Sequence, residues 1–144
     1  MKILVLQGPN LNLLGLVSRQ SGNRLTLDKL NRALRRRAGE LDLELTIHQL
    51  NGEVEAVRLI QRQRNKVAGL LLVPGIWAST GQLLRETIRI ITLPLAVYHL
   101  EPDQGPWHYH SGSIFADSAV LEESGKSAED LCGLLSSFAT RLET

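Results

Sequence analysis

Short apolar runs alternate along the chain with segments of helical periodicity, and this alternation most constrains the fold. Helical periodicity begins at Thr26 and Val54, resumes after Ser79 or Thr80, either of which can cap a helix, and returns after Ser127. The intervening runs are rich in Leu, Ile and Val and are typical of buried strands. Five strands are therefore predicted, over residues 2–7, 44–50, 67–73, 95–100 and 119–122.

Strands that alternate with helices imply right-handed crossovers between parallel strands. We therefore expect one domain over residues 1–144, an α/β fold with a flavodoxin-like, doubly wound, five-stranded parallel sheet and helices on both faces. Ligands bind such folds beyond the carboxyl ends of the strands. The site is expected in the loops that follow the strands, over residues 8–25, 50–53, 74–80 and 99–112.

The charge balance and composition exclude several partners. The 16 Lys and Arg residues against 15 Asp and Glu leave a net charge of +1, so we expect no nucleic-acid partner. The basic run Arg35–Arg37 is interpreted as a solvated helix face, because Glu40, Asp42 and Glu44 offset it. No apolar run approaches the roughly 20 residues that span a bilayer. The single cysteine, Cys132, cannot form an internal disulfide, which favours a reducing, cytoplasmic compartment.

Three histidines, His99, His108 and His110, lie in or beside the last of these loops and raise the question of a metal site. No carboxylate or cysteine completes a familiar ligand spacing along the sequence, so no metal is expected. The alternative for His108 and His110 is a hydrogen-bonded loop residue. His99 ends a strand, and we expect its imidazole to face the ligand crevice. Neither a phosphate-binding glycine pattern nor a GxSxG elbow is present.

An ordered set of motifs resembles the type II 3-dehydroquinate dehydratases. The motifs occur at family-like spacing, and the first, after the first predicted strand, is fairly specific. They are Gly8–Gly15 (GPNLNLLG), Gln49-x-Asn51-x-Glu53-x-Glu55, Pro74-Gly75, Leu84-Arg85-Glu86, Val97-Tyr98-His99-Leu100 and His110-Ser111.

The resemblance implies a trans-dehydration of 3-dehydroquinate to 3-dehydroshikimate through an enolate, without cofactor or metal. In this family a tyrosine, kept ionised by an arginine, removes the proton alpha to the ketone. An asparagine and a water stabilise the enolate, and a histidine protonates the departing hydroxyl. The family is usually a dodecamer of four trimers, which implies a homo-oligomer in which one subunit lends an acidic residue to its neighbour's site.

Three site residues of the family are carried over. Asn10 matches the loop asparagine, His99 matches the acid, and Glu86 matches the acidic residue lent across the subunit interface. Six others are replaced: the loop arginine, the tyrosine, the asparagine before Pro-Gly, the histidine after it, the glutamate before His99 and the second arginine. Their positions fall on Val17, Gly22, Val73, Ser79, Val97 and His108.

Two residues are candidates to substitute for the missing arginine and tyrosine. Arg19 lies two residues beyond the arginine position, and Tyr109 lies in the shortened segment after His99. Tyr98 precedes His99 on a strand and should point to the opposite face. With His99, Asn10 and Tyr109 as the catalytic candidates, ligand contacts are expected from Asn12, Arg19, Asn51, Glu53, Ser79, Leu100, Glu101 and His108.

Three functions follow as hypotheses, all with a small-molecule ligand. The first is a ligand-binding or regulatory pseudoenzyme that keeps the fold and the oligomer. The second is an enzyme of altered acid–base chemistry on a less polar substrate, in which His99 acts with Tyr109, His108 or Glu53. The third is an active 3-dehydroquinate dehydratase of the shikimate or quinate pathway, a carbon–oxygen lyase.

Overall fold

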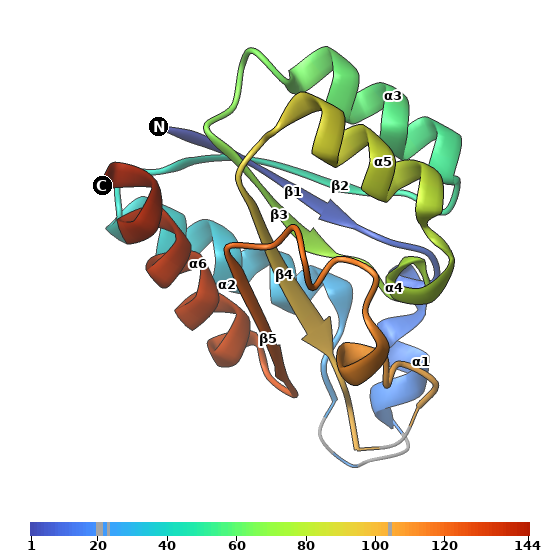
Figure 1. The fold of residues 1–144 in the computed structure, drawn as a ribbon. Coiled ribbons are helices and arrows are strands. Elements are labelled where there is room, and N and C mark those ends of the chain that lie inside the picture. Colours follow the sequence, from blue (N-terminus) through green and yellow to red (C-terminus); the bar gives the residue numbers. More distant parts are fainter. Residues whose placement is uncertain (20–21, 23, 104) are drawn as a thin grey trace.

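Strands and helices alternate through the whole chain in a computed structural model, which describes residues 1–19, 22, 24–103 and 105–144 (Figure 1). Residues 20, 21, 23 and 104, which belong to two of the predicted strand-end loops, lie outside the described residues. The strands are β1 (Lys2–Gln7), β2 (Glu44–Gln49), β3 (Gly69–Val73), β4 (Leu95–Leu100) and β5 (Leu121–Gly125). The helices are η1 (Leu11–Leu13), α1 (Leu14–Ser18), α2 (Leu27–Glu40), α3 (Glu53–Gln63), α4 (Trp77–Thr80), α5 (Gln82–Ile91), η3 (His110–Gly112) and α6 (Ala128–Glu143).

The five strands form one parallel sheet in the order β2-β1-β3-β4-β5, which confirms the predicted flavodoxin-like α/β fold. The strand order reverses between β1 and β3, so the crevice expected of a doubly wound sheet lies beyond the carboxyl ends of these two strands. The central strands are buried along their length, as their unbroken apolar runs require.

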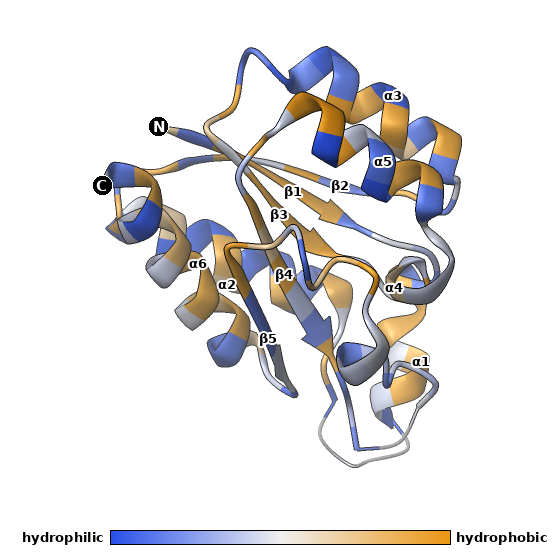
Figure 2. Ribbon diagram, in the orientation of Figure 1, coloured by the Kyte–Doolittle hydropathy of each residue, from blue (hydrophilic) through white to orange (hydrophobic). Residues whose placement is uncertain are grey.

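Alternate residues of each strand enter two separate apolar cores, one on each face of the sheet. The lower layer in Figure 1 consists of α2 and α6, which pack on strand residues such as Val5, Leu71 and Tyr98. The upper layer consists of α3 and α5, which pack on the alternate residues, such as Leu70 and Val97. Figure 2 shows the apolar strands between these helices and the polar outer faces of the helices.

Several predicted boundaries are wrong. β2 ends one residue before its predicted limit, and β3 begins two residues after its own. Residues 8–25 contain helical turns, η1 and α1, because Leu11 and Leu14 are fully buried and fold this segment against the core. The last strand is β5, residues 121–125, and it begins two residues later than the predicted strand at residue 119. Its polar sequence, LEESG, carries almost no apolar signal, and its position follows from pairing with β4.

The start of α5 also differs from the prediction. Ser79 and Thr80 lie in the short helix α4 and donate hydrogen bonds to the Ile76 carbonyl instead of capping α5. The N-cap residue is Gly81, which has no side chain to offer. The carboxylate of Glu53 accepts a hydrogen bond from the Leu84 amide at 2.8 Å and satisfies this helix end from another element.

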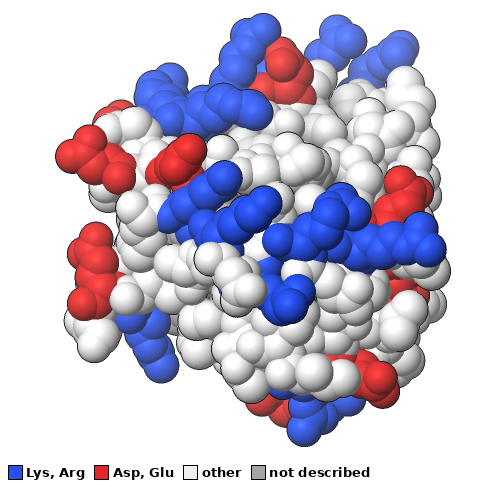
Figure 3. Space-filling view, turned by 90° about the horizontal axis from the view of Figure 1, so that it is seen from above, with Lys and Arg blue, Asp and Glu red and all other residues white. Residues whose placement is uncertain are grey.

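Basic residues gather on the outer surface above α3 and α5, although the chain as a whole is nearly neutral (Figure 3). In this layer Asp117 pairs with Arg85 at 2.6 Å, and the hydrogen bond from Arg85 holds the pKa of Asp117 below its usual range.

The longest helix in the described part of the chain has 16 residues, and none there is long and apolar enough to cross a membrane.

Candidate active site

The loops after β1 and β3 cross closely at the point where the strand order reverses. The Gly8 amide donates a hydrogen bond to the Val73 carbonyl at 2.8 Å, and a Cβ on Gly8 would clash with the Pro74 carbonyl oxygen. Only glycine therefore fits in the first position of the GPNLN loop. Asn51, after β2, accepts a hydrogen bond from the Asn10 amide at 3.0 Å and joins a third loop to this crossing.

His99 is the one predicted catalytic residue that the fold buries, with 4% of its surface exposed near the end of β4. Its Nε2 lies 2.8 Å from Oε2 of Glu122, close enough for an N–H of the imidazole to donate to the carboxylate. Burial lowers the pKa of His99 below its usual value, although the hydrogen bond to Glu122 acts in the opposite direction. The ring is therefore neutral near pH 7.

Glu122 is the functional candidate that the sequence analysis missed. It pairs in register with Val97, the position of the family's glutamate two residues before the acid histidine. Val97 and His99 share a face of β4, and Glu122 lies beside them on the same face of β5. A carboxylate thus reaches His99 from the neighbouring strand. A glutamate within a predicted strand is a weak signal for such a role, because strands seldom carry unpaired carboxylates.

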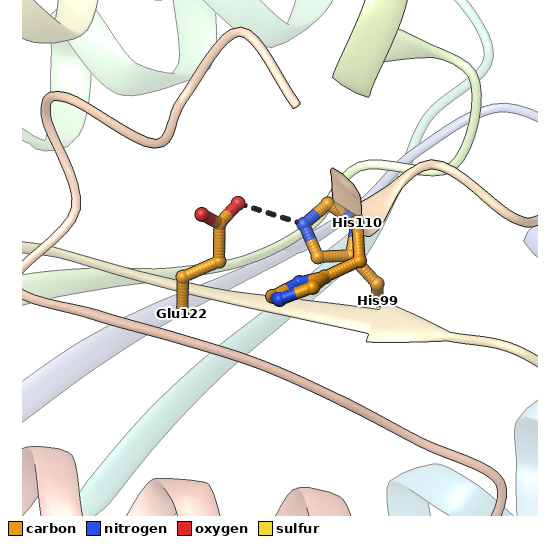
Figure 4. A group of neighbouring side chains, drawn as sticks. All are labelled: His99, His110 and Glu122. Atoms are coloured by element: carbon orange, nitrogen blue, oxygen red, sulfur yellow. Dashed lines mark hydrogen bonds and ion pairs between the residues drawn. The ribbon is translucent and has the colours of Figure 1, made fainter. Parts of the chain in front are cut away.

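His110 completes a cluster with His99 and Glu122 (Figure 4). It extends from η3, and the centroids of the two imidazole rings lie 5.0 Å apart with their planes at 75°. One nitrogen or oxygen atom from each of the three side chains lies within 4.8 Å of the others. The carboxylate that is missing from the histidine spacing in sequence is therefore present in space.

A small cavity adjoins His99, lined by apolar side chains and by the polar groups of His99, Trp107 and Tyr109. Its volume is about 10 Å³, which is room for about one water molecule. Tyr109 lines the same cavity as His99, as a substitute tyrosine would have to do, and no arginine of the described chain does so. The lining residues are Leu11, Val73, Gly75, His99, Leu100, Trp107 and Tyr109.

The segment after β4 closes over this cavity as a lid, residues 101–109 without the undescribed residue 104. Trp107 is 5% exposed and belongs to the core on the α2–α6 side. Val17, at the position of the family's loop arginine, lies under Gly105 so closely that a Cβ there would come within 2.5 Å of it. The lid is therefore held by apolar contacts where the family has charge.

The structure separates several predicted ligand contacts from His99. Glu53 is engaged with the first turn of α5. Tyr98, which was not expected to contact the ligand, packs on the opposite face as predicted, and its hydroxyl donates to the Ser127 carbonyl at 3.2 Å. Glu101 lies just beyond β4 and outside the cavity lining, but its carboxylate is close enough to act electrostatically on His99. Only Leu100 and Tyr109 of the remaining candidates line the cavity. Seven predicted site residues have exposed side chains and do not line the cavity. They are Asn10, Asn12, Arg19, Asn51, Ser79, Glu86 and His108.

A parallel sheet of order 2-1-3-4-5 with a histidine-bearing crevice at its strand ends defines the chain as a doubly wound α/β protein with a strand-end site. The chain belongs to the class II dehydroquinases, since the family model described as Dehydroquinase class II matches residues 1–131. The 3-dehydroquinate dehydratase of Geotalea daltonii is 34% identical over 139 residues, which cover 96% of each chain. That of Carboxydothermus hydrogenoformans is 35% identical over 120 residues, 83% of this chain and 78% of the relative.

Solved structures agree on the fold. The type II dehydroquinase from Butyrivibrio crossotus superposes with a TM-score of 0.85 at 18% identity, over 96% of this chain and 97% of that one. A 3-dehydroquinate dehydratase-like protein from Bifidobacterium longum gives a TM-score of 0.68 at 20% identity, over 100% and 99% of the two chains. At these identities the structures support the architecture and not the activity.

Proposed function

We propose that this family member no longer dehydrates 3-dehydroquinate and acts as a ligand-binding or regulatory pseudoenzyme. The observation that carries the proposal is the small size of the cavity beside His99, about 10 Å³, which has room for about one water molecule. Val73 and Leu11 line it together with Trp107, a buried residue of the lid. The ligand of such a site is smaller and less polar than dehydroquinate.

The polarity of the cavity argues against the family substrate. Dehydroquinate carries a carboxylate, and burying an ionised carboxylate without a cation costs several kcal/mol. No described lining residue is an arginine or lysine. Arg19 is exposed and outside the lining, so it does not take over the role of the missing loop arginine.

The missing catalytic groups argue in the same direction. The position of the family's tyrosine is Gly22, and that of the asparagine before Pro-Gly is Val73. A general base contributes about 10²–10⁴-fold and an oxyanion-stabilising donor about 10²–10³-fold. Their joint absence leaves an expected rate at least about 10⁴-fold below that of an active relative.

The test is to incubate the protein with 3-dehydroquinate and follow the enone absorbance of the product. An active type II dehydroquinase serves as the positive control, and the His99→Ala variant reports whether any signal comes from this site. We expect no rise above buffer for either the wild type or the variant. A rise in the wild type that His99→Ala abolishes would establish the active-dehydratase hypothesis in place of ours.

A second candidate function rests on the hydrogen bond between His99 and Glu122. A buried imidazole oriented by a carboxylate is an arrangement for acid–base catalysis, and Tyr109 shares its cavity. His108 and Glu53 are not part of this arrangement, because His108 is exposed outside the lining and Glu53 binds the start of α5.

This alternative predicts exchange of the protons alpha to the carbonyl of small apolar ketones. Proton NMR in D₂O measures the exchange rate with wild type, His99→Ala and Glu122→Gln. Catalysed exchange that His99→Ala abolishes and Glu122→Gln weakens would favour altered chemistry over a pseudoenzyme. Exchange no faster than in buffer leaves ligand binding as the function.

A further inference from the structure

Three segments that are distant in sequence bring two imidazoles and a carboxylate together on the α3–α5 side of the sheet edge. His99 comes from β4, Glu122 from β5 and His110 from η3. Figure 4 shows the three side chains directed toward one another. One ligand-type atom from each lies within 4.8 Å of the other two, and the His99–Glu122 pair is already at 2.8 Å.

This set of atoms suits a transition metal better than a hard cation. Ca²⁺ and Mg²⁺ prefer oxygen ligands, whereas two imidazole nitrogens and one carboxylate oxygen suit Zn²⁺ and its neighbours. Zinc binds nitrogen and oxygen at about 2.0–2.2 Å, which puts tetrahedral ligand atoms roughly 3.3 Å apart. To coordinate one ion, the more distant ligand atoms need to close by no more than about 1.5 Å, and the His99–Glu122 pair needs to open by about 0.5 Å.

We propose that His99, His110 and Glu122 form a binding site for a divalent transition-metal ion, with Zn²⁺ the best match. Three protein ligands leave the fourth tetrahedral position open to water or to a small ligand. The metal ion is then the ligand of the strand-end crevice, for which the small cavity alone suggests no candidate.

The positions of the three residues provide both rigidity and access. His99 and Glu122 lie on adjacent paired strands, so the sheet fixes two of the ligands relative to each other. The hydrogen bond between Nε2 of His99 and Glu122 already directs these two side chains toward each other. His110 is exposed, so its side chain is free to adjust and an ion can enter from solvent.

His110 distinguishes a metal site from a plain hydrogen-bonded pair. Without a metal, Glu122 needs only His99 as its partner, and His110 contributes no more than an edge contact between rings. A metal site needs all three residues. The inference goes beyond the proposed pseudoenzyme function and rests on it in one respect, because a metal-bound His99 is not available as the acid of the family reaction.

The experiment titrates Zn²⁺ into the full-length protein after treatment with a chelator, by isothermal calorimetry, with Co²⁺ and its visible absorption as a second probe. We expect one equivalent per chain, with affinity reduced at least about 100-fold in His110→Ala and in Glu122→Gln. Co²⁺ should give the intense visible bands of a tetrahedral site in the wild type only.

The control is His48→Gln, which removes a histidine from β2 at the opposite edge of the sheet and should leave the affinity unchanged. Circular dichroism in chelator confirms that each variant is folded, and His110→Ala, which changes an exposed side chain, is the decisive one. Wild-type affinity equal to that of His110→Ala, or an equal loss in His48→Gln, would overturn the site. Turnover of dehydroquinate by metal-free protein would contradict the pseudoenzyme proposal and leave the metal titration unaffected.

Discussion

At the scale of single residues, the chemistry of this protein depends on which partner each polar side chain meets. Glu53 lies in a motif shared with the family, yet its carboxylate accepts a hydrogen bond from the Leu84 amide at 2.8 Å. Tyr98 precedes His99 on β4, and its buried side chain lies on the other face of the sheet. Each therefore has a measurable structural role apart from any ligand.

Removing the carboxylate of Glu53 should destabilise the fold. In Glu53→Ala the Leu84 amide loses its partner near the start of α5, and we expect a loss of about 1–2 kcal/mol in the free energy of unfolding. Urea denaturation measures it. The control is Glu143→Ala, which removes an exposed carboxylate at the end of α6 and should change the stability by less than about 0.5 kcal/mol. Equal stability of the two variants would contradict the assigned role.

Tyr98 should make the fold sensitive to alkali. Burial raises the pKa of the Tyr98 hydroxyl well above its usual value near 10, and Asp130 acts in the same direction. Above about pH 10 the unfolded chain loses this proton while the folded chain keeps it, so stability falls as the pH rises.

The Tyr98→Phe variant separates these effects. It loses the hydrogen bond to the Ser127 carbonyl and should be about 1 kcal/mol less stable than wild type near pH 7. The difference should shrink and then reverse above about pH 10. Denaturation curves of both proteins at roughly pH 7 to 11.5 measure this difference in the free energy of unfolding. A difference that stays constant over these pH values would show that Tyr98 does not titrate as described.

At the scale of elements, Arg37 connects the two helices of one layer. Its Nη1 donates to the Cys132 carbonyl at 3.2 Å and to Ser136 Oγ at 2.7 Å, and its Nη2 lies 2.7 Å from Glu129. The expectation that Arg35–Arg37 is entirely a solvated face is therefore wrong at Arg37. The helix turn places this arginine toward α6 while Arg35 and Arg36 stay exposed.

Truncating Arg37 should loosen the contact between α2 and α6. We expect Arg37→Ala to lose about 1–2 kcal/mol of stability, mostly through the two hydrogen bonds of Nη1, because the ion pair with the exposed Glu129 contributes little. Arg36→Ala, its exposed neighbour, should lose less than about 0.5 kcal/mol. The comparison uses urea denaturation, and equal losses would argue against the bridge.

At the scale of the whole molecule, we expect one exposed face of α5 to contact a second copy of the chain. Leu83 is 46% exposed and Ile90 is 74% exposed, and Glu86, the carried-over interface acid, lies between them on the same face. Apolar side chains so placed on one stripe are typical of a covered surface. A trimer or a dodecamer built from trimers is the assembly that the family resemblance implies.

We therefore expect sedimentation velocity to give a mass that is a multiple of three chains. Ile90→Glu should lower this mass by placing a charge in the interface. Leu16→Glu, which changes an apolar residue that is 57% exposed on α1, should leave the mass unchanged. A monomeric wild type, or an equal effect of the two variants, would contradict this assembly.

Much of the fold could be predicted because its signals are local. The strands over residues 2–7 and 95–100 occur as predicted, and Thr26 and Ser127 cap the helices that follow them, with the Lys29 and Asp130 amides as donors. The family motifs are likewise stretches of adjacent residues. The absence of a tyrosine from residues 8–25 is a property of the sequence itself.

The sequence by itself therefore determined the order of the elements, the loops in which a site can lie and the catalytic groups that are missing. Only the tertiary structure placed Glu122 beside His99, turned Glu53 toward α5 and buried Trp107 of the lid against the core. The physical reason is that these contacts join residues 23 or more positions apart, or depend on how a loop closes. Sheet register sets the first of them, and a polar edge strand such as β5 carries too little hydrophobic pattern to reveal its register before it pairs.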